Sequence, residues 1–322
     1  MTVIVTGAAG FVGFHTAQAL LGQGRRVIGI DNLNTYYDPA LKEARLARLR
    51  GRDGFAFHQL DLADKEAMFA LFGTLPEVTH VVHLAAQAGV RHSMVDPYAY
   101  VSSNVMGHVT VLEAARRLPR LEHLVYASSS SVYGGNTKLP FAETDRVDTP
   151  VSLYAATKRA DELIGHAYWH LYGMKLTGLR FFTVYGPWGR PDMAYFSFAE
   201  AITAGRPITL YEGGRLKRDF TYVDDIVAGV LACLARAPER EPVVFNIGNN
   251  RGEYVSDLVR LLEDGLGRKA IIESAPRPVA DVAETCADLS AIAAWVGYAP
   301  TTPLSAGVPR FVEWFKRYRG LH

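Results

Sequence analysis

The sequence predicts an α/β fold, with a doubly wound parallel sheet followed by a smaller C-terminal domain. Three observations support this prediction. The apolar strand Val3–Thr6 runs into a glycine-rich turn and then into a helical pattern. Apolar strands and amphipathic helices alternate as far as residue 182, which is typical of parallel α/β sheets. A loop rich in glycine and proline at 183–192 ends this alternation and marks the exit into a second part of the chain.

The composition fits a protein with a large core and excludes several classes of partner. The chain has 322 residues, 49% of them hydrophobic, and a net charge of +1, so electrostatics give no reason to expect nucleic acid or an anionic membrane. No apolar run reaches the ~18 residues of a membrane span, and we expect no signal peptide. Cys233 and Cys286 form no CxxC pair, so we expect no disulfide framework and a reducing, cytoplasmic location.

The first turn carries the pattern of a dinucleotide site. Gly7, Gly10 and Gly13 follow the first strand in a GxxGxxG spacing, with Phe11 and Val12 between the last two. Glycines let the backbone approach a pyrophosphate, and the N-terminus of the following helix offers unpaired N–H groups. A glycine triplet alone could be only a tight turn. The strand before it, the helix after it and an acid downstream favour nucleotide binding.

That acid is Asp31, which closes the second strand, 26–30. A carboxylate at this strand end can accept hydrogen bonds from a ribose diol and would repel a 2′-phosphate, so we expect NAD rather than NADP. Asn32 and Asn34 follow in the same loop; they could also reach the ribose, or they could simply form the turn.

The next strands bring further residues to the same edge of the sheet. A helix at 39–50 precedes the third strand, 55–60, which leads into Asp61 and Leu62. Asp61 could meet the adenine or could cap the helix that starts near residue 64. The fourth strand, 78–84, ends in Leu84, and the small residues Ala85 and Ala86 after it leave room for a ligand.

A long helix is predicted over 98–117. Its Asn104 has apolar neighbours, which indicates that the amide faces inward. The fifth strand, 121–127, then leads into Ser128, Ser129, Ser130 and Ser131, and these hydroxyls should point into the ligand crevice. A serine-rich turn is the alternative.

Tyr154 and Lys158 lie four residues apart at the start of a helix over about 152–171, so both side chains lie on one face. The nearby cation favours the phenolate form of Tyr154, which can act as a general base. Such pairs also occur on solvated helix faces. His166 and His170 show the same spacing, but no third ligand accompanies them, so we expect no metal.

The remainder of the chain contains fewer motifs. After the sixth strand, 174–182, we expect a helix at 193–204, a strand and turn at 207–214, a helix ending at residue 234, a strand at 243–247, and helices at 255–265 and 304–318. Residues 1–182 with about 219–250 would form the nucleotide-binding domain, and about 183–218 with 251–322 would form the second domain.

Three arginines, Arg190, Arg218 and Arg277, fall in loops of this part of the chain. Arginine forks suit phosphate and carboxylate, although each alone is more often a surface charge.

Taken together, the glycine turn, Asp31, the serine run and Tyr154-x-x-x-Lys158 resemble the extended short-chain dehydrogenase/reductase superfamily, whose core is a Rossmann sheet. Within it the chain is most similar to the UDP-glucuronate 4-epimerase group, a similarity carried by the stretches 87–91, 150–158, 180–194 and 218–222. The resemblance implies that the enzyme converts UDP-glucuronic acid to UDP-galacturonic acid, with tightly held NAD and a transient 4-keto sugar.

The resemblance also implies roles for individual residues. Tyr154 would take the proton of the sugar 4-hydroxyl, Lys158 would bind the nicotinamide ribose, and Ser129 would bind O4, with Ser128 and Ser130 beside it. The other implied contacts are Thr183 and Arg190 with the sugar carboxylate, Arg218 and Arg277 with the diphosphate, and Thr209 and Tyr211 with uracil. Relatives usually show Arg-x-x-Asp where this chain has the longer Arg277-Pro278-Val279-Ala280-Asp281.

Three alternatives differ from this interpretation at particular residues. An epimerase acting on UDP-glucose or its N-acetyl form would not need Arg190, because its sugar is neutral. The dehydratases and UDP-glucuronate decarboxylases that resemble this chain carry an acid where it has Ser130 and Ser131. A cofactor-sensing regulatory protein would tend to lack the Tyr154–Lys158 pair. By the same likeness, helices at about 97–117 and 152–171 would pair with a second copy in a four-helix homodimer contact.

Overall fold

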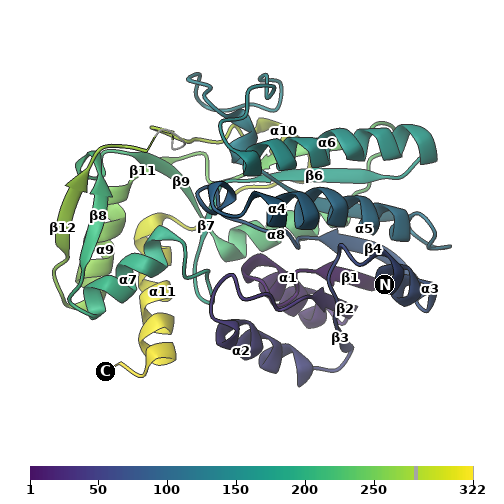
Figure 1. Cartoon of the computed structure of the whole chain (residues 1–322), viewed down its shortest axis with the longest axis horizontal. Coiled ribbons are helices and arrows are strands. Elements are labelled where there is room, and N and C mark those ends of the chain that lie inside the picture. Colours follow the sequence, from purple (N-terminus) through teal and green to yellow (C-terminus); the bar gives the residue numbers. More distant parts are fainter. Residues whose placement is uncertain (279–281, 322) are drawn as a thin grey trace.

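A parallel seven-stranded sheet is the centre of the computed structural model, which describes residues 1–278 and 282–321 (Figure 1). In spatial order its strands are β10 (Val243–Ile247), β6 (Leu176–Phe181), β5 (His123–Ser129), β4 (Val78–His83), β1 (Thr2–Thr6), β2 (Arg26–Asp31) and β3 (Phe55–Gln59). The chain therefore runs outward from β1 in one direction and from β4 in the other, which is the doubly wound order. The predicted fold class is confirmed.

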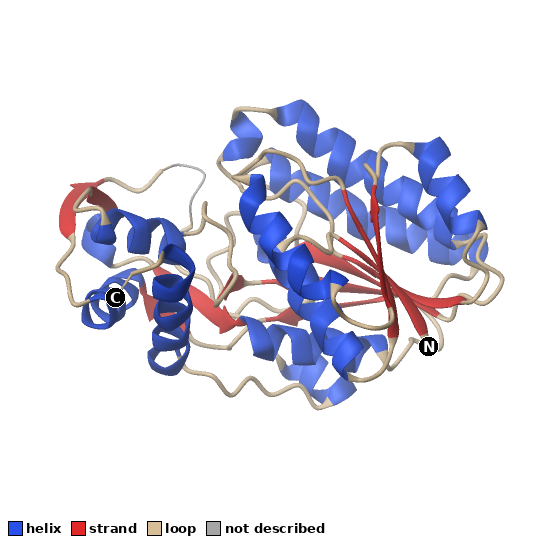
Figure 2. Cartoon of the chain, turned by 90° about the horizontal axis from the view of Figure 1, so that it is seen from below, coloured by secondary structure: helices blue, strands red, loops and turns tan. Residues whose placement is uncertain are grey.

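Helices cover both faces of this sheet (Figure 2). The central strand β1 shows why, because Val3 and Val5 pack into one apolar cluster and Ile4 packs into another. Side chains of a strand alternate between its faces, so a strand that is apolar throughout must be covered twice. The covering helices are α1 (Phe11–Gly22), α2 (Pro39–Arg50) and α8 (Val223–Leu234) on one face, and α3 (Lys65–Gly73), α5 (Gly107–Ala115) and α6 (Leu153–Tyr172) on the other.

A smaller group of elements lies beside the carboxyl end of the large sheet, at the left of Figure 1. Its strands form a three-stranded sheet, β7 (Thr183–Tyr185), β9 (Lys217–Tyr222) and β11 (Gly252–Tyr254), and a pair, β8 (Pro207–Tyr211) and β12 (Ile271–Ala275). Its helices are α7 (Ala194–Thr203), α9 (Val255–Leu266) and α11 (Leu304–Arg319), while α10 (Ser290–Val296) packs near β10 and α8. In the described ranges, no helix is long and apolar enough to cross a membrane.

The helix predicted over 98–117 is present at 97–115, but it is not a regular α-helix throughout. It divides into α4 (Pro97–Tyr100), a π-helical segment η2 (Val101–Met106) and α5. Asn104 lies in the π-helical segment and is buried. Its amide accepts a hydrogen bond from the backbone N–H of Gln87 (2.8 Å) and donates to Thr157 Oγ1 (3.0 Å). The wider turn of the π-helix directs the Asn104 amide inward, where it provides hydrogen-bond partners for the buried Gln87 N–H and Thr157 hydroxyl.

Candidate active site

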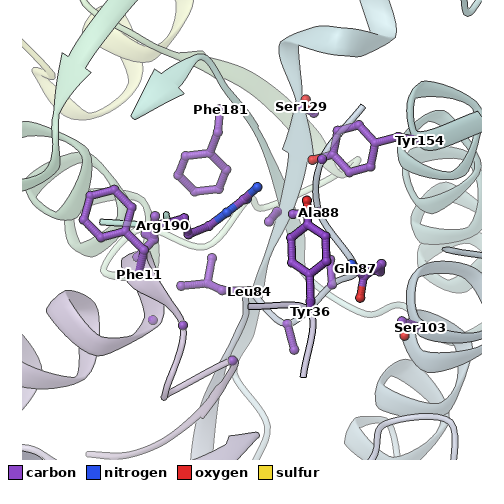
Figure 3. A pocket seen from close by; sticks show the side chains of 18 of the residues that line it. Phe11, Tyr36, Leu84, Gln87, Ala88, Ser103, Ser129, Tyr154, Phe181 and Arg190 are labelled. Carbon is purple, nitrogen blue, oxygen red and sulfur yellow. The ribbon is translucent and has the colours of Figure 1, made fainter. Parts of the chain in front are cut away.

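A cavity of about 380 Å³ opens at the carboxyl ends of β1, β2, β4 and β5, where the strand order reverses (Figure 3). Open α/β sheets bind their ligands at this position. Most residues that the sequence nominated for the site line it: Gly7, Gly10, Phe11, Val12, Gly13, Asp31, Asn32, Asn34, Asp61, Leu62, Leu84, Ala85, Ala86, Ser128, Ser129, Ser130, Tyr154, Lys158, Thr183 and Arg190.

The backbone of the glycine turn is packed too closely for side chains at these positions. Gly7 has a φ of +72°, and a Cβ on Gly13 would lie 2.0 Å from the Gly7 carbonyl oxygen. The Gly10 N–H donates to that same oxygen (2.8 Å), and α1 begins at Phe11 with no side-chain cap from the described residues. The backbone N–H groups at the start of α1 are therefore open toward the cavity, and this cradle fits a pyrophosphate.

Asp31 lines the cavity and also binds the backbone of the two loops next to it. Its carboxylate accepts hydrogen bonds from the N–H groups of Ala9 (3.2 Å) and Leu33 (2.9 Å). Lys42, which the sequence interpretation did not include, lies 3.9 Å from Asp31 Oδ1 and donates to Asn34 Oδ1 (2.8 Å). Burial lowers the pKa of Lys42, against the opposing effect of Asp31.

Asp61 is not the cap of α3. The N-cap is Asp64, whose Oδ1 accepts from the Ala67 N–H (3.0 Å). Asp61 instead accepts from the Ala63 N–H and from Asn32 Nδ2, both at 2.9 Å, and it lines the cavity.

Tyr154 and Lys158 face the cavity from the first turns of α6, whose N-cap Ser152 accepts a hydrogen bond from the Ala155 N–H (3.1 Å). Lys158 is buried, and its Nζ donates to the Ala127 carbonyl oxygen and to Asp161 Oδ2, both at 3.0 Å. The ammonium is thereby fixed beside β5, on the same helix face as the phenol.

The serine run has two environments. Ser128 Oγ donates to Glu162 Oε1 (2.6 Å), and the same carboxylate takes two hydrogen bonds from Arg180 (2.8 and 2.9 Å). Burial opposes the ionisation of Glu162, but the Arg180 guanidinium outweighs it and holds the pKa of Glu162 below its ordinary value. Ser129 Oγ bonds only within the run, to Ser131 (3.1 Å), in the described part of the chain. Ser128 is thereby bound to a buried ion pair, whereas the hydrogen bonds of the Ser129 hydroxyl stay within the serine run at the cavity.

Thr183 and Arg190 enter the cavity from the chain that leaves the large sheet. The Arg190 guanidinium forms two hydrogen bonds with Asp192, Nε to Oδ1 at 3.0 Å and Nη2 to Oδ2 at 2.5 Å. The arrangement places a cation, a phenol–lysine pair and a hydroxyl array around one space (Figure 3).

Comparison with known proteins assigns this arrangement to a family. The sequence profile of the NAD dependent epimerase/dehydratase family matches residues 3–248. The chain belongs to this family. UDP-glucuronate 4-epimerase 4 of Arabidopsis thaliana is 51% identical over 99% of this chain and 76% of its own length.

Solved structures of the family superpose closely on this chain. The UDP-glucuronic acid 4-epimerase of Bacillus cereus, in complex with UDP-glucuronic acid and NAD, has a TM-score of 0.92 at 33% identity and covers 99% of this chain and all of its own. The UDP-glucose 4-epimerase of Thermotoga maritima, with UDP-glucose, reaches a TM-score of 0.89 at 30% identity over the same shares. The match to this epimerase/dehydratase family confirms the expected superfamily and its NAD dependence.

Five nominated residues are not part of this cavity as the described residues form it. Asn104 supports its wall from behind, through Gln87. Thr209, Tyr211, Arg218 and Arg277 lie on or near β8 and β9 in the smaller part of this epimerase/dehydratase chain. The guanidinium carbon of Arg91 lies 4.9 Å from the centre of the Tyr211 ring. Arg277 Nε lies 3.8 Å from Glu212 Oε1. Asp281, the end of the lengthened arginine motif, is outside the described residues.

The sequence interpretation missed several residues of this site. Tyr36 and Gln87 line the cavity, Asp161 binds Lys158, and Asp192 binds Arg190. Asp161 stands three residues after Lys158, a spacing at which helical side chains meet. Nothing in the sequence pairs Tyr36 with Asp192, because they are far apart in the chain.

Proposed function

We propose that this protein is an NAD-dependent UDP-glucuronate 4-epimerase, which interconverts UDP-glucuronic acid and UDP-galacturonic acid through a transient 4-keto sugar. The observation that carries the proposal is that Arg190 lines the same cavity as Tyr154 and Lys158. An arginine fork suits a sugar carboxylate, and the tyrosine and lysine suit removal of a hydroxyl proton. A relative with half of its residues identical bears the name of this activity.

The acid–base chemistry falls to Tyr154. Its phenolate takes the proton of the sugar 4-hydroxyl and returns it after the keto sugar has turned its other face. Lys158 lies on the same helix face as Tyr154, and the N–H of its ammonium that is not bound to Ala127 or Asp161 would be available to the nicotinamide ribose. Ser129 holds O4, with Ser130 beside it. The Ser128 hydroxyl donates to Glu162, so we give Ser128 a share in shaping this wall.

Bound NAD would supply the oxidant for C4 of the sugar and, as NADH, the hydride that returns to the opposite face. The residues that would hold it are the cradle Gly7, Gly10, Phe11, Val12 and Gly13 for the pyrophosphate, Asp31, Asn32 and Asn34 for the ribose, and Asp61, Leu62, Leu84, Ala85 and Ala86 around the adenine and the crevice, with Asn104 behind. We assign this cofactor to residues 1–182 with about 219–250.

The sugar nucleotide would extend from this cavity toward the smaller domain, about 183–218 with 251–322. Thr183 and Arg190 take the carboxylate. Arg218 and Arg277 meet the diphosphate, and Thr209 and Tyr211 hold the uracil, close to Arg91. Such a site grips the UDP firmly and leaves the sugar free to turn.

The alternatives fit the cavity less well. A neutral UDP-glucose, the ligand of the Thermotoga maritima neighbour, gives Arg190 no charge to neutralise. Decarboxylation or elimination is served by an acid beside the keto sugar, and this chain has Ser130 and Ser131 at those positions.

A single substitution tests whether the protein is this enzyme. Tyr154→Phe keeps the ring and removes the base, so turnover of UDP-glucuronic acid should fall by about 10²–10⁴-fold. Tyr254→Phe is the matched control, because Tyr254 is 44% exposed, does not line the cavity and should keep full activity. Full activity in Tyr154→Phe would contradict the mechanism and revive a regulatory role.

We also propose a cytoplasmic homodimer. Apolar side chains on α4, η2 and α6 are exposed in the single chain, namely Tyr98 (84%), Val101 (48%), Met106 (55%), Leu163 (56%) and Leu171 (64%). A face of this kind favours a helix-to-helix contact with a second copy. Light scattering at micromolar concentration should give twice the chain mass, and Leu163→Glu with Leu171→Glu should give one chain mass. A monomeric parent protein would remove the claim.

A further inference from the structure

Tyr36, Asp192 and Arg190 form a chain of contacts across the mouth of the cavity. Tyr36 belongs to the loop after β2, and its hydroxyl donates to Asp192 Oδ2 (3.1 Å). Asp192 in turn binds Arg190 through both carboxylate oxygens. The loop that follows Asp31 is thereby tied to the loop that carries Arg190.

The contact with Asp192 decides which edge of the guanidinium remains for a ligand. Asp192 occupies the edge made by Nε and Nη2. The edge made by Nη1 and Nη2 is not taken by Asp192, so it is the edge that can meet a second carboxylate, beside the Tyr36 hydroxyl. Each edge of a guanidinium can bind a carboxylate through two parallel hydrogen bonds. In Figure 3 the guanidinium end of Arg190 and the rings of Tyr36 and Tyr154 point toward the same space.

Tyr36 is itself fixed. A Cβ on Gly89 would lie 2.5 Å from the Tyr36 hydroxyl, so the hydroxyl rests on this backbone. The Tyr36 ring also packs 4.8 Å from the His92 ring. The Arg190 and Asp192 side chains are 22% and 27% exposed, so water competes with this pair only in part.

We propose that Asp192 is a positioning residue, held by Tyr36, that aims one edge of Arg190 at the sugar carboxylate and so keeps the keto intermediate from losing carbon dioxide. The inference rests on the proposed function. Oxidation at C4 makes a β-keto acid. When its C5–C6 bond aligns with the carbonyl π system, that bond breaks, its electron pair passes through C5 to O4, carbon dioxide leaves, and C5 then takes a proton to give a UDP-4-ketopentose. A guanidinium held in one orientation holds the carboxylate away from this alignment.

Asp192→Asn, Tyr36→Phe and Asp257→Asn test the inference. Asp257 pairs with Arg260 at 3.3 Å on the surface of α9, so its variant makes the same chemical change outside the cavity. Each NAD-loaded protein is incubated with UDP-glucuronic acid, and released carbon dioxide and UDP-galacturonic acid are measured together. In Asp192→Asn, kcat for epimerisation should fall by about 10–100-fold, the loss typical of a misplaced reacting group. Its ratio of carbon dioxide to UDP-galacturonic acid should rise at least about tenfold, with KM changed less than kcat.

Tyr36→Phe, which keeps the ring, should raise the same ratio by a smaller factor, and Asp257→Asn should match the parent. An unchanged ratio in Asp192→Asn and Tyr36→Phe, with only KM raised, would overturn the inference, because a purely structural role loses binding without changing the products. Thermal melting shows whether Asp192→Asn is folded, and Tyr36→Phe provides the test if it is not. A parent protein that makes no UDP-galacturonic acid would instead remove the proposed function, and this inference with it.

Discussion

The ion pair between Lys158 and Asp161 lies almost wholly inside the protein. The two side chains are 4% and 1% exposed, and Nζ lies 3.0 Å from Oδ2. Asp161 Oδ1 is also buried and has no hydrogen-bond partner among the described residues. The carboxylate therefore depends on the lysine for compensation of its charge. In Lys158→Met the uncompensated charge should lower the free energy of unfolding by about 3–5 kcal/mol.

The double variant Lys158→Met/Asp161→Leu separates this structural effect from catalysis. Replacing both partners of a buried pair by apolar side chains is often neutral or stabilising, so most of the lost stability should return. Activity should not return, because Lys158 lines the cavity beside Tyr154.

Urea unfolding of the parent, the two single variants and the double variant, at one pH and salt concentration, measures the coupling of the pair. The exposed pair Asp257–Arg260 is the matched control, and breaking it should cost no more than about 1 kcal/mol. Two results would contradict the stabilisation of Lys158 by a buried counter-charge. One is a Lys158→Met variant as stable as the parent within about 0.5 kcal/mol, and the other is single effects that simply add in the double variant.

Three further predictions concern the carboxylate, the cofactor and pH. Arg190→Ala should lower kcat/KM for UDP-glucuronic acid by about 10- to 10²-fold, because a hydrogen bond to a charged group contributes about 1.5–3 kcal/mol. It should change UDP-glucose turnover far less, and equal losses would contradict the carboxylate role. Gly13→Ala should abolish NAD binding in calorimetry, since its Cβ would clash with the Gly7 carbonyl oxygen, and parent-like affinity would show the cradle is misassigned. Burial raises the pKa of Asp219 to about 6, above about 3.9 in an unfolded chain, so the native state binds this proton more tightly and the stabilisation is lost as pH rises from about 4 to about 6. Over that interval the unfolding free energy of the parent should fall relative to Asp219→Asn, and a flat or rising difference would refute the assignment.

The sequence is most informative where burial leaves a regular pattern. The inner strands of the large sheet are buried on both faces, so they appear as apolar runs, and the glycine turn follows the first strand. Of the strands in the smaller sheets, only β8 was predicted, as part of the strand and turn at 207–214, and β7, β9, β11 and β12 were not. β7 and β11 have only three residues each, and β9 begins with Lys217, Arg218 and Asp219, whose charges hide a strand. The π-helical segment at 101–106 was missed because its pattern is that of an ordinary helix, and only the partners of Asn104 require the wider turn.

The residues of the candidate site were also predictable only where a local sequence pattern marks them. Residues next to a strand end or spaced along one helix, such as Asp31, Ser129, Tyr154 and Lys158, could be nominated from local pattern alone. The contact between Tyr36 and Asp192 could not, because it depends on how loops from the two parts of the chain meet.

The products formed from UDP-glucuronic acid test the central claim most directly. Purified protein is incubated with UDP-glucuronic acid and NAD, and the sugar nucleotides are identified by NMR. We predict a mixture of UDP-glucuronic acid and UDP-galacturonic acid with no net NADH, because the keto sugar stays bound until it is reduced. A pentose product with carbon dioxide would contradict it and show that the cavity does not protect the carboxylate. Turnover of UDP-glucose alone would show that Arg190 serves another purpose.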